Sequence, residues 1–360
     1  MGSRLSKGLF TLLLLISPLF GQDGNISHLA PGPPSVPIKP VIKSQALYLG
    51  WIPHKPRVLA QTIYDEQLQD LVKYNDDENA LLYKFLYKAL EDSKQLTSEE
   101  VSTKRLDSLN QGSVGSCVGY GTCRALDVLM AVNAYHRQQL HQIWLSRAHP
   151  NAIYAIGRKD NPGRYDGSTG SWSMEGLAKY GTLHRLKYSS FDLSLPIVAQ
   201  DARTWANSGL PGDTLKDAAE HKLITFAQIN TAAEAKAALQ NGYSIIVCSG
   251  ISYSTHRDEN AFAKRTPQGW NHCLCCIAYR GPQSGKEGFL IGNSWGPSWN
   301  DGPIWPDDMP WGSFFITPED LEVQLRAGDS YALSSYNGFA RRKIKWEEVF
   351  DFNTKIKDEQ

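Results

Sequence analysis

A cysteine, a histidine and an asparagine occur along this chain in settings that could together support nucleophilic catalysis. Cys117 follows the run NQGSVGS and opens a stretch with helical periodicity. A thiol at the N-terminus of a helix lies at the positive end of the helix dipole, which favours the nucleophilic thiolate. Taken alone, this motif more often marks a buried structural cysteine. Two further segments favour catalysis, because His272 opens an apolar, strand-like run and Asn293 lies in the sequence GNSWG.

The motifs around these residues resemble those of the papain family of cysteine peptidases. The segments that carry the resemblance are residues 110–117, 271–279 and 290–299. The resemblance implies that Cys117 is the nucleophile, that His272 is the general base and acid, and that Asn293 orients the imidazole. It further implies that the Gln111 side chain and the Cys117 backbone N–H stabilise the oxyanion. Trp295 would shield the His–Asn pair from water and border the bound substrate.

A glycine-rich segment at residues 166–174 resembles the part of the family that pairs with the substrate backbone. Gly167 and Gly170 would then offer backbone groups to an extended peptide, and Met174 would lie near a side-chain pocket. The alternative is an ordinary surface turn. Some expected family features are missing, since Val114 and Ser168 or Thr169 stand where many members have a disulfide. These departures indicate a divergent bacterial or viral member.

The chain is expected to have the α+β class, because helical patterns come first and strand-like runs follow. A helical hairpin is predicted for residues 61–96, with Leu82, Phe85, Leu86 and Leu90 on one face, and a long helix runs from Cys117 toward Tyr135. The predicted strands are residues 243–248, 273–279, 288–291 and 314–316. The resemblance implies a papain-like two-subdomain fold, with a helical left half, an antiparallel β-barrel-like right half and the active-site cleft between them.

The ends of the chain differ in composition from its centre. A basic start, a short apolar run and a proline predict a signal peptide at residues 1–21, with a retained membrane anchor as the alternative. Residues 22–47 read as a Pro-rich linker. Residues 48–104 form an extension that is either a removable pro-region or integral to the fold. The second alternative is favoured because LGWIP resembles the opening of some bacterial papain-like domains. The peptidase domain is placed at residues 105–340, and residues 341–360 form a charged, peripheral tail.

Charge and cysteine usage limit the classes of partner. Lys plus Arg and Asp plus Glu both number 37, so a nucleic-acid partner is not expected. The six cysteines are expected to be buried free thiols. A metal site is not expected at Cys273, Cys275 and Cys276, since adjacent strand residues point to opposite faces. No cofactor is expected, and the protein is expected to be a monomer.

Together these features predict an exported cysteine-type peptidase, extracellular or periplasmic, that acts on proteins or peptides through acyl-enzyme chemistry. Two other interpretations remain open. One is a catalytically silent papain-like binding or structural protein, although the complete Gln–Cys–His–Asn set argues against it. The other is a cysteine amidase or transferase that acts on cell-wall peptides. Side-chain preference, and the choice between endo- and exopeptidase, do not follow from the sequence.

Overall fold

A computed structural model describes residues 47–48, 50–53, 79–163, 165–335, 339 and 342. The predicted signal peptide, the linker apart from Leu47 and the first helix of the predicted hairpin lie outside the described residues. Within the described ranges, no helix combines the length and the apolar character that a membrane span requires.

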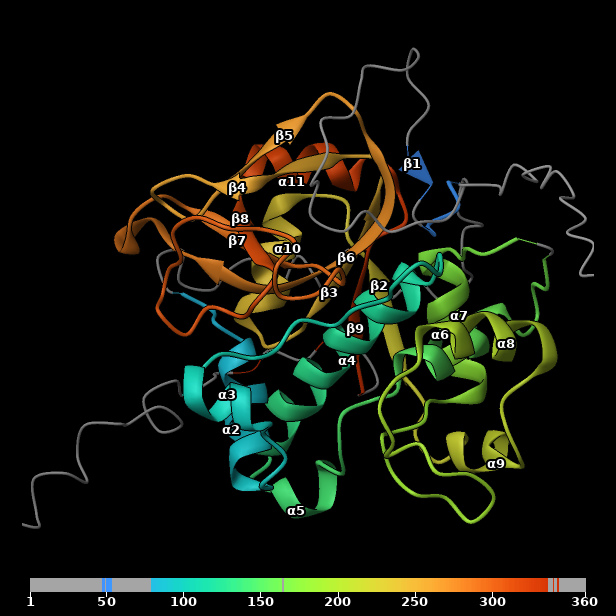
Figure 1. Cartoon of the computed structure of the whole chain (residues 1–360). Helices are drawn as coiled ribbons and strands as arrows, with labels where there is room; N and C mark the ends of the chain where they lie inside the picture. The colour runs from blue at the N-terminus through green and yellow to red at the C-terminus, as the bar shows by residue number, and fades with distance from the viewer. Residues whose placement is uncertain are drawn as a thin grey trace, which may run out of the picture.

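The central element is helix α4 (Cys117–His136), which confirms the long helix predicted from Cys117. It lies between the sheet and the other helices, as Figure 1 shows. Two glycines permit this close packing. A Cβ at Gly119 would come within 2.6 Å of Tyr154, and one at Gly121 would come within 3.3 Å of Cys273. The surrounding helices are α5 (Leu140–Ile143), α6 (Pro150–Arg158), α7 (Gly170–Tyr180), α8 (Ala199–Ser208) and α9 (Thr214–Ala218).

Two short helices precede α4. Helix α2 (Tyr83–Asp92) confirms the second helix of the predicted hairpin, and all four residues predicted for its apolar face are buried. Helix α3 (Ser98–Thr103) was not predicted, although Thr97 and Glu100 form a capping box that the sequence pattern could have indicated. Glu100 is fully buried and forms an ion pair of 2.5 Å with Arg147, so this connection is tied to the helical half.

The sheet has the strand order β2-β9-β3-β6-β7-β8, and neighbouring strands on this path are antiparallel. It remains open rather than closing into a barrel. Strand β1 (Leu47–Tyr48) is parallel to β6, and helices α10 (Ala232–Gln240) and α11 (Pro318–Leu325) pack against β3. The bounds are β2 (Thr225–Gln228), β3 (Ile245–Ser249), β6 (Trp270–Arg280), β7 (Gly288–Gly292), β8 (Ser313–Ile316) and β9 (Tyr331–Ser334), with β4 (Ser252–Arg257) and β5 (Ala263–Thr266) as a separate pair. The four predicted strands are confirmed.

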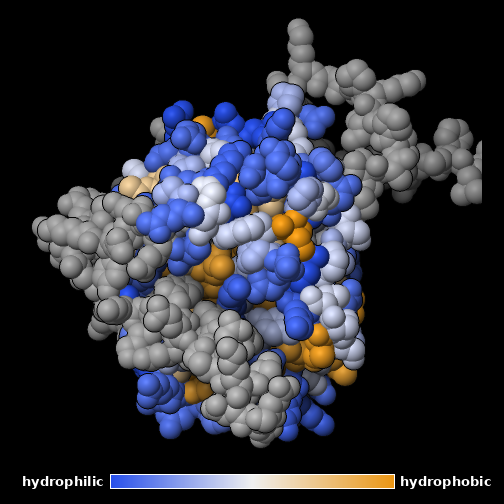
Figure 2. Space-filling view, turned by 90° about the vertical axis from the view of Figure 1, so that its left-hand side faces the viewer, coloured by the Kyte–Doolittle hydropathy of each residue, from blue (hydrophilic) through white to orange (hydrophobic). Residues whose placement is uncertain are grey.

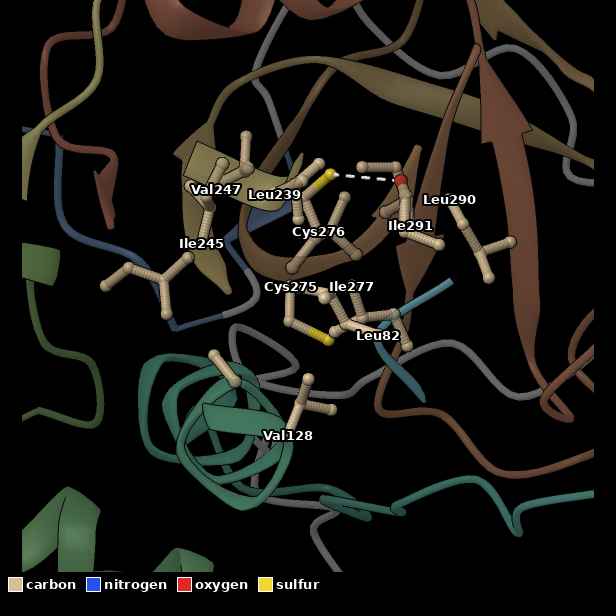
Figure 3. Packing of buried hydrophobic residues seen from close by; sticks show 14 of the residues in the cluster. Leu82, Val128, Leu239, Ile245, Val247, Cys275, Cys276, Ile277, Leu290 and Ile291 are labelled. Atoms are coloured by element: carbon tan, nitrogen blue, oxygen red, sulfur yellow. Dashed lines mark hydrogen bonds between the residues drawn. The ribbon is translucent and has the colours of Figure 1, made fainter. Parts of the chain in front are cut away.

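Strand β6 is buried on both of its faces. Figure 3 shows Cys275 on the side that faces Val128 of α4, while Cys276 points to the opposite side and toward the carbonyl of Ala278. All six cysteines are buried and free. Among the described residues, no group of His, Cys, Asp or Glu side chains is arranged to hold a metal ion. The surface in Figure 2 is mostly hydrophilic, with scattered apolar patches.

Arg342 departs from the predicted peripheral tail. Its side chain is buried, its backbone N–H donates to Asn241 at 3.0 Å, and its guanidinium lies 3.9 Å from the ring centre of Tyr243. It also bonds to Asn133 of α4. A tail composed largely of charged residues can still contribute a buried arginine where polar partners and an aromatic face are available.

Candidate active site

Cys117 is the first residue of α4 and is fully buried. The preceding loop turns at Gly112, whose φ of +58° favours glycine. The Cys117 Sγ accepts a hydrogen bond of 3.4 Å from the backbone N–H of Cys273. Burial and the neighbouring Cys273 thiol raise the pKa of Cys117 well above its ordinary value, although this backbone N–H acts in the opposite direction. In this closed structure the thiol is therefore the favoured form.

His272 and Asn293 come from two adjacent strands of the sheet. His272 lies near the start of β6, and Asn293 directly follows β7. The His272 Nε2 lies 2.8 Å from the Asn293 Oδ1. That oxygen also accepts the backbone N–H of Ser294 at 2.7 Å, which identifies it as the carbonyl oxygen of the side chain. Because this oxygen can only accept, Nε2 carries the proton in the neutral ring and Nδ1 has the lone pair.

The His272 Nδ1 is buried and has no hydrogen-bond partner in the described part of the chain. His272 directly precedes Cys273, and the Cys273 backbone N–H contacts the Cys117 sulfur. A ring nitrogen with a lone pair and no partner among the described residues can act as a general base. The structure thus places His272 against Asn293, and Cys117 against the residue that follows His272, at the boundary between the helical half and the sheet.

Aromatic rings surround the imidazole. The Trp295 ring stacks on His272 with centroids 4.5 Å apart and an interplanar angle of 26°. Trp270 contacts His272 edge-on at 5.9 Å and Trp295 at 4.7 Å, while Trp299 packs against Trp295 at 5.3 Å. This enclosure excludes water, and burial lowers the pKa of His272 to about 4 even though the bond to Asn293 acts in the opposite direction. The neutral imidazole is favoured in the closed structure.

Gln111 joins the nucleophile loop to the turn that carries Asn293. Its Oε1 accepts from the Ser294 hydroxyl at 2.7 Å, and its Nε2 donates to the Val114 carbonyl at 3.0 Å. Its backbone N–H donates to the Ser294 carbonyl at 2.9 Å, and the Gly296 N–H donates to the Leu109 carbonyl at 3.0 Å. These contacts fix the Gln111 side chain beside the nucleophile loop. Its service as an oxyanion donor remains a prediction.

The glycine-rich segment is used differently at each predicted residue. Gly167 is engaged internally, because its N–H donates to the Tyr154 hydroxyl at 2.7 Å and its carbonyl accepts from Arg158 at 2.6 Å. The Gly170 N–H donates to Asp329 at 2.6 Å. Met174 is fully buried in the main core. The backbone that pairs with an extended chain belongs to Ser168, between the two glycines.

The chain that pairs with Ser168 is residues 50–53 of the protein itself, here called the covering segment. The Ser168 N–H donates to Gly50 at 2.7 Å, and the Ser168 carbonyl accepts from Ile52 at 2.8 Å. The Trp51 N–H donates to the carbonyl of Asn271, the residue before His272, at 3.2 Å. Gly50 packs so closely on Gly115 that a Cβ would lie 2.3 Å from the Gly115 carbonyl oxygen. The covering segment therefore lies between the nucleophile loop, the glycine-rich segment and β6.

Sequence reasoning noted residues 49–53 only as an opening of the fold, and it missed their pairing with Ser168 and a second feature, Asp329. Asp329 is fully buried and accepts the Trp51 indole N–H at 2.8 Å and the Ser171 backbone N–H at 2.9 Å. Gly50 and Trp51 lie next to each other near the predicted boundary at residue 48, which is a weak local signal for the covering segment. No local pattern could connect Asp329 to Ser171, because the two are 158 residues apart.

Buried neutral histidines predict a loss of stability in acid. Burial lowers the pKa of His149 to about 3 and that of His184 to about 4, as it does for His272. The unfolded chain binds protons near the ordinary pKa of about 6.5, so it takes up more protons than the folded chain between that pH and about 4. Stability is therefore complete above about pH 6.5 and decreases as the pH falls, by about 3 kcal/mol for each such group at about pH 4.

Urea unfolding at pH 7 and pH 4.5 measures this loss. A His149→Phe variant keeps a ring against Trp205, which contacts His149 at 5.2 Å, and removes one titrating group. We expect it to show a smaller difference in unfolding free energy between the two pH values. An undiminished difference would contradict the assignment of His149 as a buried neutral group.

No model of a known protein family and no curated protein matches the chain. Among solved structures, xylellain, a cysteine protease from Xylella fastidiosa, aligns with a TM-score of 0.51 at 16% identity, over 83% of this chain and 100% of that chain. The proform of the ragweed pollen allergen Amb a 11, a cysteine protease, aligns with a TM-score of 0.42 at 16% identity over 70% of each chain. Digestive procathepsin L 3 of Tenebrio molitor gives 0.42 at 13% identity, over 75% of this chain and 90% of that chain. The likeness to xylellain, together with the helical half, the antiparallel sheet and the residues at their boundary, identifies the fold of this chain as papain-like.

Proposed function

We propose that the protein is a cysteine peptidase that hydrolyses peptide bonds in proteins or peptides through an acyl-enzyme. The observation that carries the proposal is the bond of 2.8 Å between His272 and Asn293, which leaves the buried Nδ1 as a base next to the residue that contacts Cys117. That nitrogen has no partner among the described residues, so its lone pair is available to accept a proton. The signal-like residues 1–21 support action outside the cytoplasm.

The proposed reaction follows from the tautomer of His272. Its Nδ1 accepts the thiol proton while the Cys117 sulfur attacks the peptide carbonyl carbon. The imidazolium then returns the proton to the leaving amine, and an acyl-enzyme remains. Water, deprotonated by the same nitrogen, hydrolyses the thioester and restores the thiol. Asn293 holds the ring through Nε2 in every step.

Gln111 and the Cys117 backbone N–H would stabilise the oxyanion that forms on the substrate carbonyl. The Ser294 hydroxyl holds the Gln111 amide oxygen, which fixes where the amide nitrogen lies. One such donor typically contributes about 2.7–4 kcal/mol to the stability of the transition state. Substrate access requires the covering segment to leave, because the same backbone groups of Ser168 and Asn271 would serve an extended peptide.

Labelling with an epoxide inhibitor of cysteine peptidases tests the proposal. Such an epoxide is opened by a thiolate, so the product mapped by mass spectrometry reports an activated cysteine. We expect stoichiometric modification at Cys117, and its loss in a His272→Ala variant. The five other cysteines serve as internal controls, because they are buried like Cys117 but have no catalytic base assigned to them. No labelling of Cys117 by the full chain or by a Gly50→Ala variant would favour a catalytically silent scaffold.

A further inference from the structure

The Trp51 side chain lies where the side chain of a bound peptide would lie. The Trp51 backbone is held on both sides. Ser168 bonds to Gly50 and Ile52, which flank Trp51, and the Asn271 carbonyl accepts the Trp51 N–H. The indole is buried at 4% exposure and donates to Asp329 at 2.8 Å. A peptide residue anchored by the same backbone groups would therefore direct its side chain toward Asp329.

The Asp329 side chain is fixed in the core by backbone hydrogen bonds. Gly170 and Ser171, at the N-terminus of α7, each donate a backbone N–H to the carboxylate, at 2.6 and 2.9 Å. The close approach depends on Gly170, because a Cβ there would lie 2.6 Å from the Asp329 carbonyl oxygen and 3.0 Å from its side chain. Burial, and then Asp329, raise the pKa of Tyr331, whose hydroxyl also bonds to the Asp329 side chain.

We propose that Asp329 determines substrate specificity by selecting a peptide side chain that carries an N–H donor, preferably arginine or lysine, in the place now filled by Trp51. This inference rests on the proposed peptidase function for its biological meaning. When the covering segment leaves, the carboxylate loses the indole donor and faces the position of the incoming side chain. A guanidinium or ammonium restores a charge-assisted hydrogen bond, whereas an aliphatic chain leaves a buried carboxylate oxygen without that donor. Binding sites built around such a bond reject side chains that lack it.

The first test uses the covering segment as its own ligand and requires no peptidase activity. In the full chain, Trp51→Arg keeps an N–H donor for Asp329, and Trp51→Leu removes it. The rate of Cys117 alkylation by iodoacetamide, with the modified residue confirmed by mass spectrometry, reports how often the segment leaves. We expect the Leu variant to react at least about tenfold faster than the Arg variant, since one charge-assisted bond is worth that ratio or more. Equal rates would overturn the proposal.

Asp329→Asn completes the cycle by removing the charge while it keeps a carbonyl oxygen. In this background the Arg variant is expected to lose its advantage over the Leu variant. A retained advantage would show that another group recognises the arginine, and would also overturn the proposal. If Asp329→Asn fails to fold, the alkylation rates of Trp51→Arg and Trp51→Leu in the chain that keeps Asp329 decide whether the proposal holds.

The second test measures hydrolysis by the opened Gly50→Ala chain. Fluorogenic peptides that differ only in arginine or norleucine, scanned through each position before the scissile bond, should show a kcat/KM ratio of about tenfold or more in favour of arginine at one position. That ratio should collapse in the Asp329→Asn variant. A preference for norleucine at every position would contradict Asp329 as the selecting residue. Absence of hydrolysis for every peptide would instead contradict the proposed function, and the alkylation rates alone would then decide whether Asp329 selects the side chain.

Discussion

Replacing Cys117 by alanine is expected to lower kcat/KM for peptide hydrolysis by about 10⁴-fold or more, because removal of the nucleophile ends acyl-enzyme formation. The fold should persist. The sulfur accepts the backbone N–H of Cys273 at 3.4 Å, and alanine fits the space that the sulfur leaves. Hydrolysis of a fluorogenic peptide, measured in parallel with thermal unfolding, separates lost chemistry from lost structure.

The matched control for this variant is Cys123→Ala. Cys123 lies in the same helix, is also fully buried, and its sulfur donates to the Ala148 carbonyl at 3.3 Å. It contacts neither His272 nor Asn293 in the structure, so its removal should leave kcat/KM close to that of the parent chain. Equal activity of the Cys117→Ala variant and its parent would disprove Cys117 as the nucleophile. Equal losses in both variants would indicate damage to α4 rather than to the chemistry.

Gly50→Ala is expected to free the covering segment and to increase the rate of Cys117 alkylation at neutral pH by about tenfold or more. The added methyl group would lie 2.3 Å from the Gly115 carbonyl oxygen, and the φ of +116° is strained for any residue other than glycine. Together these effects exceed the roughly 1.4 kcal/mol that corresponds to a tenfold change in population. Alkylation by iodoacetamide followed by mass spectrometry measures the change.

Gly285→Ala controls for backbone strain alone. Gly285 has the same φ of +116°, but a Cβ there would meet no atom within 4 Å. We expect this variant to be slightly less stable and to alkylate at the parental rate. If both variants alkylate equally fast, general destabilisation explains the result and the covering segment does not control access.

Opening should also change the pH dependence of alkylation. Burial now raises the pKa of Cys117 and lowers that of His272, so both groups are held in their neutral forms. Hydration of the pair would lower the first pKa and raise the second. The thiolate would then form at lower pH in the Gly50→Ala chain than in the parent. The pH–rate profile of the variant is accordingly expected to lie at lower pH.

The catalytic candidates could be predicted from the sequence because each lies in a short motif with its own chemical reason. Cys117 opens a helical pattern, and the resemblance of three short motifs to the papain family implied the roles of Cys117, His272 and Asn293. Helices α2 and α4 and strands β3, β6, β7 and β8 followed from apolar patterns, whereas strands β1, β2 and β9 were not predicted. What local patterns could not supply was the register between distant segments.

The features that were missed depend on contacts between segments far apart in sequence. Trp51 reaches Asp329 across 278 positions, and the parallel pairing of β1 with β6 has no signature in either strand. Arg342 was expected at the periphery because its neighbours are charged, yet Asn133, Asn241 and Tyr243 provide a buried place for it. Such contacts form because each buried polar group requires a hydrogen-bond partner, and the folded chain as a whole determines which groups are buried near one another.

The hydrogen bonds that join Leu109 and Gln111 to Ser294 and Gly296 also affect the time course of the reaction. They link the two sides next to the catalytic residues, so separation of the two halves there would break several bonds at once. We expect access to come instead from departure of the covering segment, which is a unimolecular motion. If that motion is slow, turnover begins after a lag with a first-order rate constant, and raising the substrate concentration does not shorten the lag once binding outpaces re-closure.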